Sequence, residues 1–285
     1  MENGMPNVTS EFNLSLEQFH EIAQVVERMT GINLPERKHA LVYSRLARRV
    51  RALGMKSFAD YTAFVNGTEG KDELFKMAEA LTTNVTKFFR EDHHFEHFKT
   101  HLMPRLISKA KAGEKVRIWS AGCSSGQEPY SIALCILASL PDARSYDIKI
   151  LATDINTQVL ATGRRGVYAL EDLASIPANL RNSWTEASGN QFEFDEAAKR
   201  LISFKQLNLI EPWPMKGLFN AIFCRNVMIY FSPELQSTLW ERFASKLDDE
   251  GMIYIGHSER VIGPATGKLN IEGPTAYRKK LRAVA

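Results

Sequence analysis

Cysteine is scarce in the 285-residue sequence, which contains only three: Cys123, Cys135 and Cys224. None of them forms a CxxC pair, so the sequence indicates neither a disulfide framework nor a finger-type zinc site. Long apolar runs are also missing, since the longest, residues 132–140, is far shorter than the ~20 residues of a membrane-spanning helix. The first residues include acids and no apolar h-region of a signal peptide. We therefore expect a cytoplasmic protein with no direct membrane insertion.

Composition and charge point to a folded chain with a local basic segment. Apolar residues make up 44% and charged residues 24%, which excludes a disordered or collagen-like protein. At ~150 residues per domain, the length suggests about two domains. The net charge is +3, but residues 28–56 contain eight basic residues and one acid, so this segment is +7 and the remainder is −4.

Residues 15–81 have the apolar periodicity of helices. Ser15 and Gln18 have the spacing of a capping box, which predicts a first helix. A second helix is predicted between Pro35 and Gly54, with an apolar stripe on one face and arginines outside it. The stripe consists of Val42, Leu46, Val50 and Leu53. Two shorter helices are expected at residues 58–65 and 72–81.

Beyond residue 115, predicted strands alternate with predicted helices. The expected strands are residues 116–120, 148–153, 219–224 and 252–256, and the expected helices are residues 129–140, a segment from 157, and 233–247. This alternation predicts a mostly parallel sheet with helices on both faces. Residues 184–204 interrupt it with phenylalanines that alternate with acids, which predicts a small antiparallel insertion.

The loop at residues 121–126 follows the first predicted strand and contains Gly122 and Gly126. Asp154 ends the next strand, where a carboxylate can accept hydrogen bonds from both hydroxyls of a ribose. The loop is not G-x-G-x-x-G, and Asp154 lies 28 residues after Gly126 rather than the usual ~20. These departures favour S-adenosylmethionine over NAD, although ordinary turn chemistry also explains such a pattern.

Several longer strings resemble the chemoreceptor glutamate methyltransferases, the CheR family. The resemblance extends from about Glu36 to Tyr277, and its strings occur in order along the chain. They are VYSRLARRVR at 42–51, LTTNVTKFFR at 81–90, EPYS at 128–131, IFCRNVMIYF at 222–231 and GHSE at 256–259.

The resemblance implies an α/β fold, in which a Rossmann-like S-adenosylmethionine-dependent methyltransferase domain with a small antiparallel β-subdomain follows an all-helical N-terminal domain. The expected parts are a disordered tail at 1–13, a helical domain at 14–81, a linker at 82–92 that contributes to the cofactor site, and a methyltransferase domain at 93–285. The β-subdomain is expected at about 168–205.

The resemblance also implies an activity and its residues. The expected reaction is transfer of a methyl group from S-adenosylmethionine to glutamates on the cytoplasmic helices of chemoreceptors, with S-adenosylhomocysteine as product. Arg90 and Tyr230 are expected beside the reacting methyl. The expected cofactor contacts are Asn84, Thr86, Arg90, Glu128, Asp154, Asn208, Leu209, Arg225 and Asn226. A noncatalytic sensor of the cofactor or its product is the competing class, and the presence of Arg90 and Tyr230 favours the enzyme.

Alternatives accompany several of these residues. Arg90 could pair structurally with Glu91 or Asp92 instead of orienting a carboxylate. The histidines at 93, 97 and 101 recur every four residues, but no metal site is expected, because a helix face of solvated imidazoles explains them. Cys123 is interpreted as a small loop residue and His257 as a hydrogen-bonding residue.

The basic segment also has more than one interpretation. Cationic helices commonly contact nucleic acid phosphates, and a solvated face is another explanation. However, residues 208–213 lack the Asn/Asp-Pro-Pro-aromatic string of nucleic-acid amino-methyltransferases, so nucleic acid is not expected as a partner. We expect Arg45, Arg48 and Arg51 to dock an acidic receptor helix. Members of the resembled family that dock on a receptor C-terminal tether have a slightly longer hairpin loop in the insertion at 184–204, so the resemblance disfavours tether docking here. A monomer is expected.

Overall fold

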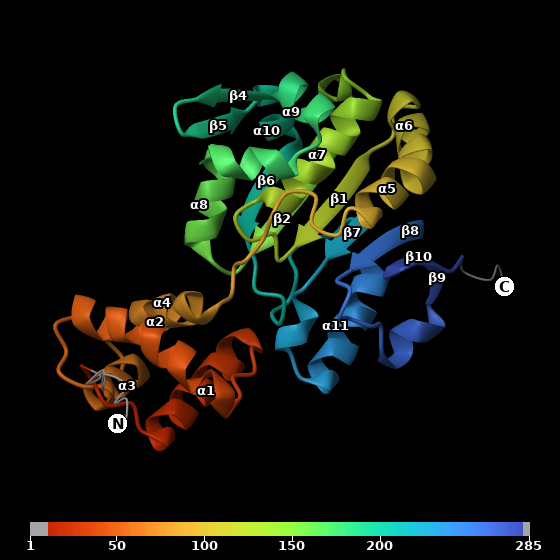
Figure 1. The fold of residues 1–285 in the computed structure, drawn as a ribbon. Coiled ribbons are helices and arrows are strands. Elements are labelled where there is room, and N and C mark those ends of the chain that lie inside the picture. The colour runs from red at the N-terminus through yellow and green to blue at the C-terminus, as the bar shows by residue number, and fades with distance from the viewer. Residues whose placement is uncertain (1–10, 282–285) are drawn as a thin grey trace, which may run out of the picture. The chain divides into compact units, whose positions relative to one another are not determined.

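The computed structural model describes residues 11–281 and divides the chain into two compact units between Thr83 and Asn84. Figure 1 shows the first unit in red to orange and the second in yellow to blue. Most of the expected tail at 1–13 lies outside the described residues, and the other expected domain boundaries stay predictions. Within the described range, no helix is both long enough and apolar enough to cross a membrane.

The first unit is all-helical, as predicted. Ser15 accepts a hydrogen bond from the backbone of Gln18 and the Gln18 side chain accepts one in return, so the capping box is present. Gly54 follows the second helix with a φ of +66°, the left-handed conformation that glycine tolerates. The helices are α1 (Leu16–Thr30), η1 (Glu36–Lys38), α2 (His39–Ala52), α3 (Phe58–Asn66) and α4 (Lys71–Leu81).

The second unit is built on a seven-stranded sheet with the strand order β6-β2-β1-β7-β8-β10-β9. The first five of these strands are parallel, and β10 is antiparallel to both β8 and β9. The strands are β1 (Val116–Ala121), β2 (Ile148–Asp154), β6 (Ile202–Gln206), β7 (Phe219–Cys224), β8 (Leu247–Ile255), β9 (Leu269–Gly273) and β10 (Ala276–Lys279). The predicted mostly parallel sheet is confirmed.

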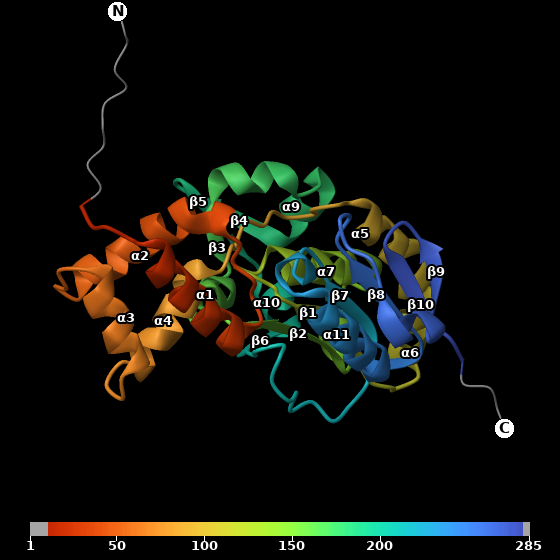
Figure 2. The same ribbon diagram turned by 90° about the horizontal axis from the view of Figure 1, so that it is seen from below.

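Helices cover both faces of this sheet (Figures 1 and 2). Ile118 packs in the core with residues of α7, whereas its neighbour Trp119 contacts Phe243 of α11, with ring centroids 5.1 Å apart. Successive strand residues point to opposite faces, so α7 and α11 lie on different sides. The helices are α5 (His93–His97), the π-helical η2 (Phe98–Leu102), α6 (Met103–Lys111), α7 (Gln127–Ser139), η3 (Ala143–Ser145), α8 (Thr157–Arg165), η4 (Leu170–Ser175), α9 (Ala178–Trp184), α10 (Glu196–Leu201), η5 (Met228–Tyr230), α11 (Pro233–Lys246) and η6 (Gly263–Gly267).

The antiparallel insertion predicted at residues 184–204 is correct only in its first half. A small antiparallel sheet has the order β3-β5-β4, from β3 (Val167–Ala169), β4 (Thr185–Ser188) and β5 (Gln191–Phe194). After β5, the side chain of Asp195 caps α10, and β6 then pairs in parallel with β2. Short polar and apolar runs in the sequence do not distinguish a helix that is followed by an edge strand from a third strand of a hairpin.

Candidate cofactor and active site

The glycine loop and Asp154 lie together at the carboxyl ends of β1 and β2, where open α/β sheets bind ligands. The backbone amides of Gly122 and Cys123 donate to the carbonyl of Thr153, at 2.8 and 2.9 Å. The Asp154 side chain accepts from the amide of Ser124 through Oδ2, at 2.8 Å, and from that of Asn156 through Oδ1, at 2.9 Å. A carboxylate oxygen can accept more than one hydrogen bond, and a carboxylate at this position is a suitable partner for ribose hydroxyls.

The loop needs glycine at two positions. Gly122 has a φ of +77° and Gly126 a φ of +99°, and a Cβ at Gly126 would lie 2.8 Å from the hydroxyl of Tyr168. A Cβ at Gly122 would lie 2.4 Å from Cγ2 of Val227, which follows β7. The loop therefore packs closely against its surroundings, as expected where a backbone must approach a ligand.

Arg225 lies at the centre of the site, immediately after β7, with a side chain that is 2% exposed. Its guanidinium is 3.3 Å from Oε2 of Glu128 and 3.4 Å from Oε2 of Glu91. It also donates to the carbonyl of Arg90 and lies 5.5 Å from the ring centroid of Phe95. Buried charges of this kind persist only when they are paired and hydrogen-bonded, so Arg225 links three segments that are distant in sequence.

The two carboxylates beside Arg225 lie in different environments. Glu128 is in the first turn of α7 and accepts a hydrogen bond from the hydroxyl of Ser120 at 2.7 Å. Burial raises the pKa of Glu128, against the opposing effect of the Arg225 charge. Burial also disfavours the charged form of Glu91, but the hydrogen bond from His257 and the Arg225 charge lower the pKa of Glu91 to about 2. Glu91 is therefore ionised at neutral pH.

The turn after Arg225 is held by Glu259. Asn226 has a φ of +58°, which is strained for a residue with a side chain. Glu259 is 4% exposed, and its carboxylate accepts hydrogen bonds from the amides of Asn226, Val227 and Met228, at 3.0, 2.8 and 2.8 Å. From the sequence, Glu259 has no assigned role, and Glu91 is considered only as a possible partner of Arg90. The GHSE string contained Glu259, but only the structure shows what its carboxylate contacts.

Arg90 lies between two residues with positive φ, Phe89 at +51° and Glu91 at +55°. Its guanidinium donates to the carbonyl of Val85 at 3.0 Å. Among residues 11–281 it forms no ion pair, and Glu91 pairs with Arg225 instead. The alternative in which Arg90 pairs with Glu91 or Asp92 is therefore wrong.

The remaining predicted cofactor residues lie on two segments next to the loop and Asp154. The carbonyl of Asn84 accepts from the hydroxyl of Ser124 at 2.9 Å, which ties the segment containing Thr86 to the glycine loop. The amide of Leu207 donates to the carbonyl of Asp154 at 3.0 Å, which places Asn208 and Leu209 directly after this contact. Asn226 donates through Nδ2 to Glu91 at 3.3 Å, and half-buried Tyr230 ends η5.

The structure agrees with the expected roles of Cys123 and His257 but not with that of His97. Cys123 is 1% exposed, and burial raises the pKa of its thiol, so it is not a nucleophile. His257 donates a 2.9 Å hydrogen bond from Nδ1 to the ionised carboxylate of Glu91, as expected for a hydrogen-bonding residue. The interpretation of solvated imidazoles is wrong for His97, which is 3.2 Å from the hydroxyl of Tyr254 and stacks on His101.

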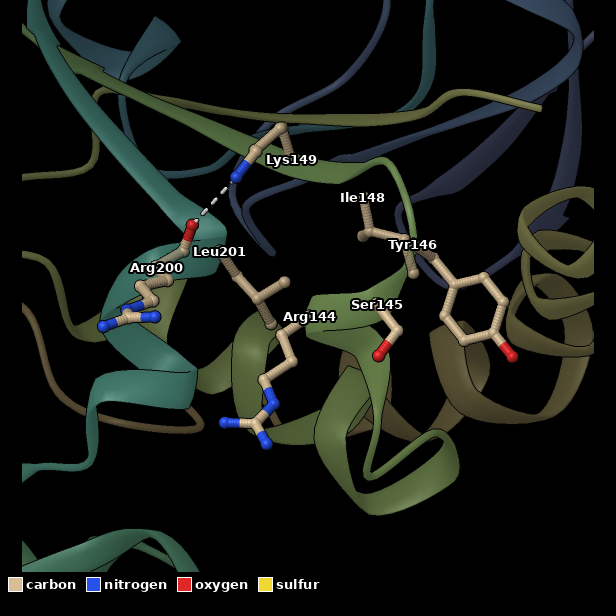
Figure 3. A pocket seen from close by; sticks show the side chains of 7 residues that line it. All are labelled: Arg144, Ser145, Tyr146, Ile148, Lys149, Arg200 and Leu201. Carbon is tan, nitrogen blue, oxygen red and sulfur yellow. Dashed lines mark hydrogen bonds between the residues drawn. The ribbon is translucent and has the colours of Figure 1, made fainter. Parts of the chain in front are cut away.

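A separate pocket of about 370 Å³ lies at the start of β2 (Figure 3). It is lined by Arg144, Ser145, Tyr146, Ile148, Lys149, Arg200 and Leu201. Ile148 and Asp154 are the first and last residues of β2, and at ~3.3 Å per residue they are about 20 Å apart. This pocket is therefore not part of the site around Asp154.

The geometry defines an α/β domain with a ligand site at the carboxyl ends of its strands. Residues 84–277 match the CheR methyltransferase, SAM binding domain, and residues 17–82 match the CheR methyltransferase, all-alpha domain. The chain therefore belongs to the CheR methyltransferase family, and its second unit is an S-adenosylmethionine-binding methyltransferase domain.

Curated relatives agree with this family. A probable chemotaxis protein methyltransferase of Rhizobium etli is 47% identical over 252 residues, which are 87% of this chain and 94% of the relative. Chemotaxis protein methyltransferase 2 of Pseudomonas aeruginosa is 41% identical over 94% of both chains. The chemotaxis protein methyltransferase of Salmonella typhimurium is 36% identical over 95% of this chain and 92% of its own.

We predict that Asp154→Ala weakens binding of S-adenosylmethionine by roughly 1–3 kcal/mol, because the variant lacks a charged hydrogen-bond acceptor for the ribose. Isothermal titration calorimetry measures this change. Asp147→Ala is the matched control, since Asp147 is an exposed acid that pairs with Arg117 just before β2. Circular dichroism of both variants checks the fold. An unchanged affinity in a folded Asp154→Ala protein would refute the ribose contact.

Proposed function

We propose that this chain forms methyl esters on glutamate side chains of the cytoplasmic helices of chemoreceptors, as a cytoplasmic, monomeric enzyme of chemotactic adaptation. The observation that carries the proposal is Arg90, which forms no ion pair within residues 11–281 and lies beside a buried Arg225 that pairs with Glu91 and Glu128. The names of the relatives, chemotaxis protein methyltransferases, support the same pathway.

The residues around the loop fit S-adenosylmethionine. Asp154 would accept hydrogen bonds from the ribose hydroxyls, and its two oxygens are oriented by the amides of Ser124 and Asn156. Glu128, Arg225 and Asn226 would contact the charged end of the cofactor. Asn84, Thr86, Asn208 and Leu209 would complete the site from the two adjoining segments. When bound, the cofactor supplies a sulfonium methyl group with a good leaving group.

The acceptor in this reaction needs no strong base. A glutamate side chain has a reference pKa near 4.3 and is ionised at neutral pH. The protein must mainly align the carboxylate with the methyl group and exclude water, and such positioning supplies several kcal/mol, up to ~7–11 in the best cases. Arg90 and the Tyr230 hydroxyl would hold the carboxylate in one orientation. A tight ion pair would lower its nucleophilicity, so Arg90 has an orienting role.

The basic helix α2 would provide docking for an acidic receptor helix. Arg48 and Arg51 are exposed, and Arg51 pairs with Glu11 at the surface. Arg45 is partly buried and donates to the carbonyl of Thr82 at 2.6 Å, so part of its role is to hold the end of α4. The β4–β5 hairpin has only two residues in its turn, Gly189 and Asn190. That short turn disfavours tether docking, so α2 would carry more of the recognition.

Methyl ester formation is tested with labelled S-adenosylmethionine and receptor-bearing membranes. We expect the protein to transfer label to the receptors, and mild alkali to release it as volatile methanol, because carboxyl esters hydrolyse in base. Membranes without receptors are the control. Label that survives alkali would exclude a carboxylate acceptor, and cofactor binding without any transfer would indicate the noncatalytic sensor.

Arg90→Ala should reduce receptor methylation by roughly tenfold or more while the fold persists, because the acceptor carboxylate loses its orienting cation. Initial rates at saturating cofactor measure the effect. The matched control is Arg144→Ala, since Arg144 is an exposed arginine in the same unit, remote from Asp154. Full activity of the Arg90 variant would exclude this residue from the reaction.

Replacing Arg48 and Arg51 together with alanine should raise the KM for receptor and leave cofactor affinity unchanged, because electrostatic steering weakens when positive charge is lost. Adding Arg45→Ala should raise the KM further. Because Arg45 also donates to the carbonyl of Thr82, circular dichroism checks that the triple variant is folded. The control variant removes Arg144 and Lys149, two cations of the other unit. Added salt should lower wild-type activity more than that of the double variant. Normal receptor kinetics would show that the docking assignment is wrong.

A further inference from the structure

His94 and Glu91 bring two hydrogen-bond acceptors together in the interior. His94 is fully buried, and its Nε2 is 2.7 Å from Oγ1 of Thr275. That hydroxyl donates its one hydrogen to the carbonyl of Pro274 at 2.8 Å, so it accepts the hydrogen of His94 Nε2. In the neutral imidazole, Nδ1 then carries a lone pair.

This lone pair faces a carboxylate. His94 Nδ1 is 3.6 Å from Oε2 of Glu91. Both atoms are buried, and within the described range neither has a hydrogen-bond partner. Among residues 11–281, Oε2 of Glu91 has an ion pair with Arg225 at 3.4 Å but no hydrogen bond, and Nδ1 of the neutral His94 ring has neither. Acceptors without hydrogen bonds are costly in a low-dielectric interior, and a cation between these two atoms would satisfy both.

A third ligand lies next to this pair. His93 precedes His94 and is exposed. One of its ring nitrogens, one nitrogen of His94 and one carboxylate oxygen of Glu91 all lie within 4.8 Å of one another. With metal–ligand distances of 2.0–2.2 Å, tetrahedral geometry separates neighbouring ligand atoms by about 3.3–3.6 Å. The His94–Glu91 pair already has this separation, and an exposed His93 side chain can rotate to complete it.

We propose that Glu91, His93 and His94 form a binding site for a divalent transition-metal ion of the Zn²⁺ class. Two imidazole nitrogens and one carboxylate suit Zn²⁺ and its neighbours rather than Mg²⁺ or Ca²⁺. The hydrogen bond from His94 Nε2 to Thr275 is the kind of outer contact that orients a metal-binding histidine. His257 lies 2.9 Å from Oε1 of Glu91 and has an exposed side chain, so we consider it a candidate for the fourth position.

Metal binding would affect the cofactor site through Glu91. A metal on Oε2 would draw this atom from Arg225, which now lies 3.4 Å away. Arg225 would then keep only Glu128 as a carboxylate partner. This consequence rests on the proposed cofactor site, whereas metal binding itself does not. We therefore expect the metal-loaded protein to bind S-adenosylmethionine more weakly.

Metal binding is measured on the full chain without a histidine tag. A chromophoric chelator competes for Zn²⁺ and gives the stoichiometry and affinity, and the visible spectrum of added Co²⁺ reports the coordination geometry. We expect one ion per chain, with an intense Co²⁺ spectrum typical of four-coordination. His93→Asn should weaken binding by roughly tenfold or more, as expected for loss of a ligand.

His101→Asn is the matched control, because His101 is an exposed histidine outside the ligand set. It should keep the wild-type affinity and spectrum. Glu91→Gln tests the carboxylate, with circular dichroism to show that the fold persists. The proposal is overturned if the wild-type chain binds no ion at one equivalent, if the Co²⁺ spectrum matches that of the aqueous ion, or if the His93 and His101 variants bind alike. A loss of binding in a folded Glu91 variant supports it.

Discussion

The site depends on one buried ion group, the guanidinium of Arg225 between Glu91 and Glu128. Glu91 follows the segment that ties to the glycine loop, Glu128 begins α7, and Arg225 follows β7. Removing one partner from a buried pair typically costs 3–5 kcal/mol, because a charge is left uncompensated. Each segment is therefore stable in this arrangement only when the other two are in place. Chain segments that are distant in sequence, such as those of Glu128 and Arg225, 97 residues apart, are positioned together by charge.

Two other carboxylates fix loops of the site by accepting hydrogen bonds from backbone amides. Asp154 holds the amides of Ser124 and Asn156, and Glu259 holds those of Asn226 to Met228. Ser124 and Asn226 both have positive φ, a conformation that costs of order 1–3 kcal/mol and persists only where surrounding contacts require it. Strain at the carboxyl ends of β1 and β7 is thus offset by hydrogen bonds to charged acceptors, which are stronger than neutral ones.

The sequence was informative where a local rule decides the structure. Periodicity located the four N-terminal α-helices, and the four residues from Ser15 to Gln18 predicted the capping box. The strand that ends at Asp154 predicted that this carboxylate lies beside the loop, and its contact with a ribose stays a prediction. Prediction failed where partners are distant in sequence. Glu91 contacts residues 225, 226 and 257, and β6 joins β2 across fifty residues. The composition of the chain and the spacing of its residues do not indicate which distant residues pair.

Arginine illustrates why charge counts alone do not identify function. Arg225 pairs with Glu91 and Glu128, and Arg49 pairs with Glu73, whose side chain is 4% exposed. Arg45 donates to backbone carbonyls. These side chains contribute to the net charge of their segments but are committed to the fold. Arg48 is exposed on α2, and within the described part of the chain the Arg90 side chain bonds only to a backbone carbonyl. A cation whose charge is not neutralised within the protein remains available to an external carboxylate. The +7 segment therefore presents fewer free charges than its composition implies, and in the proposed docking the arginines that the fold leaves unpaired would matter most.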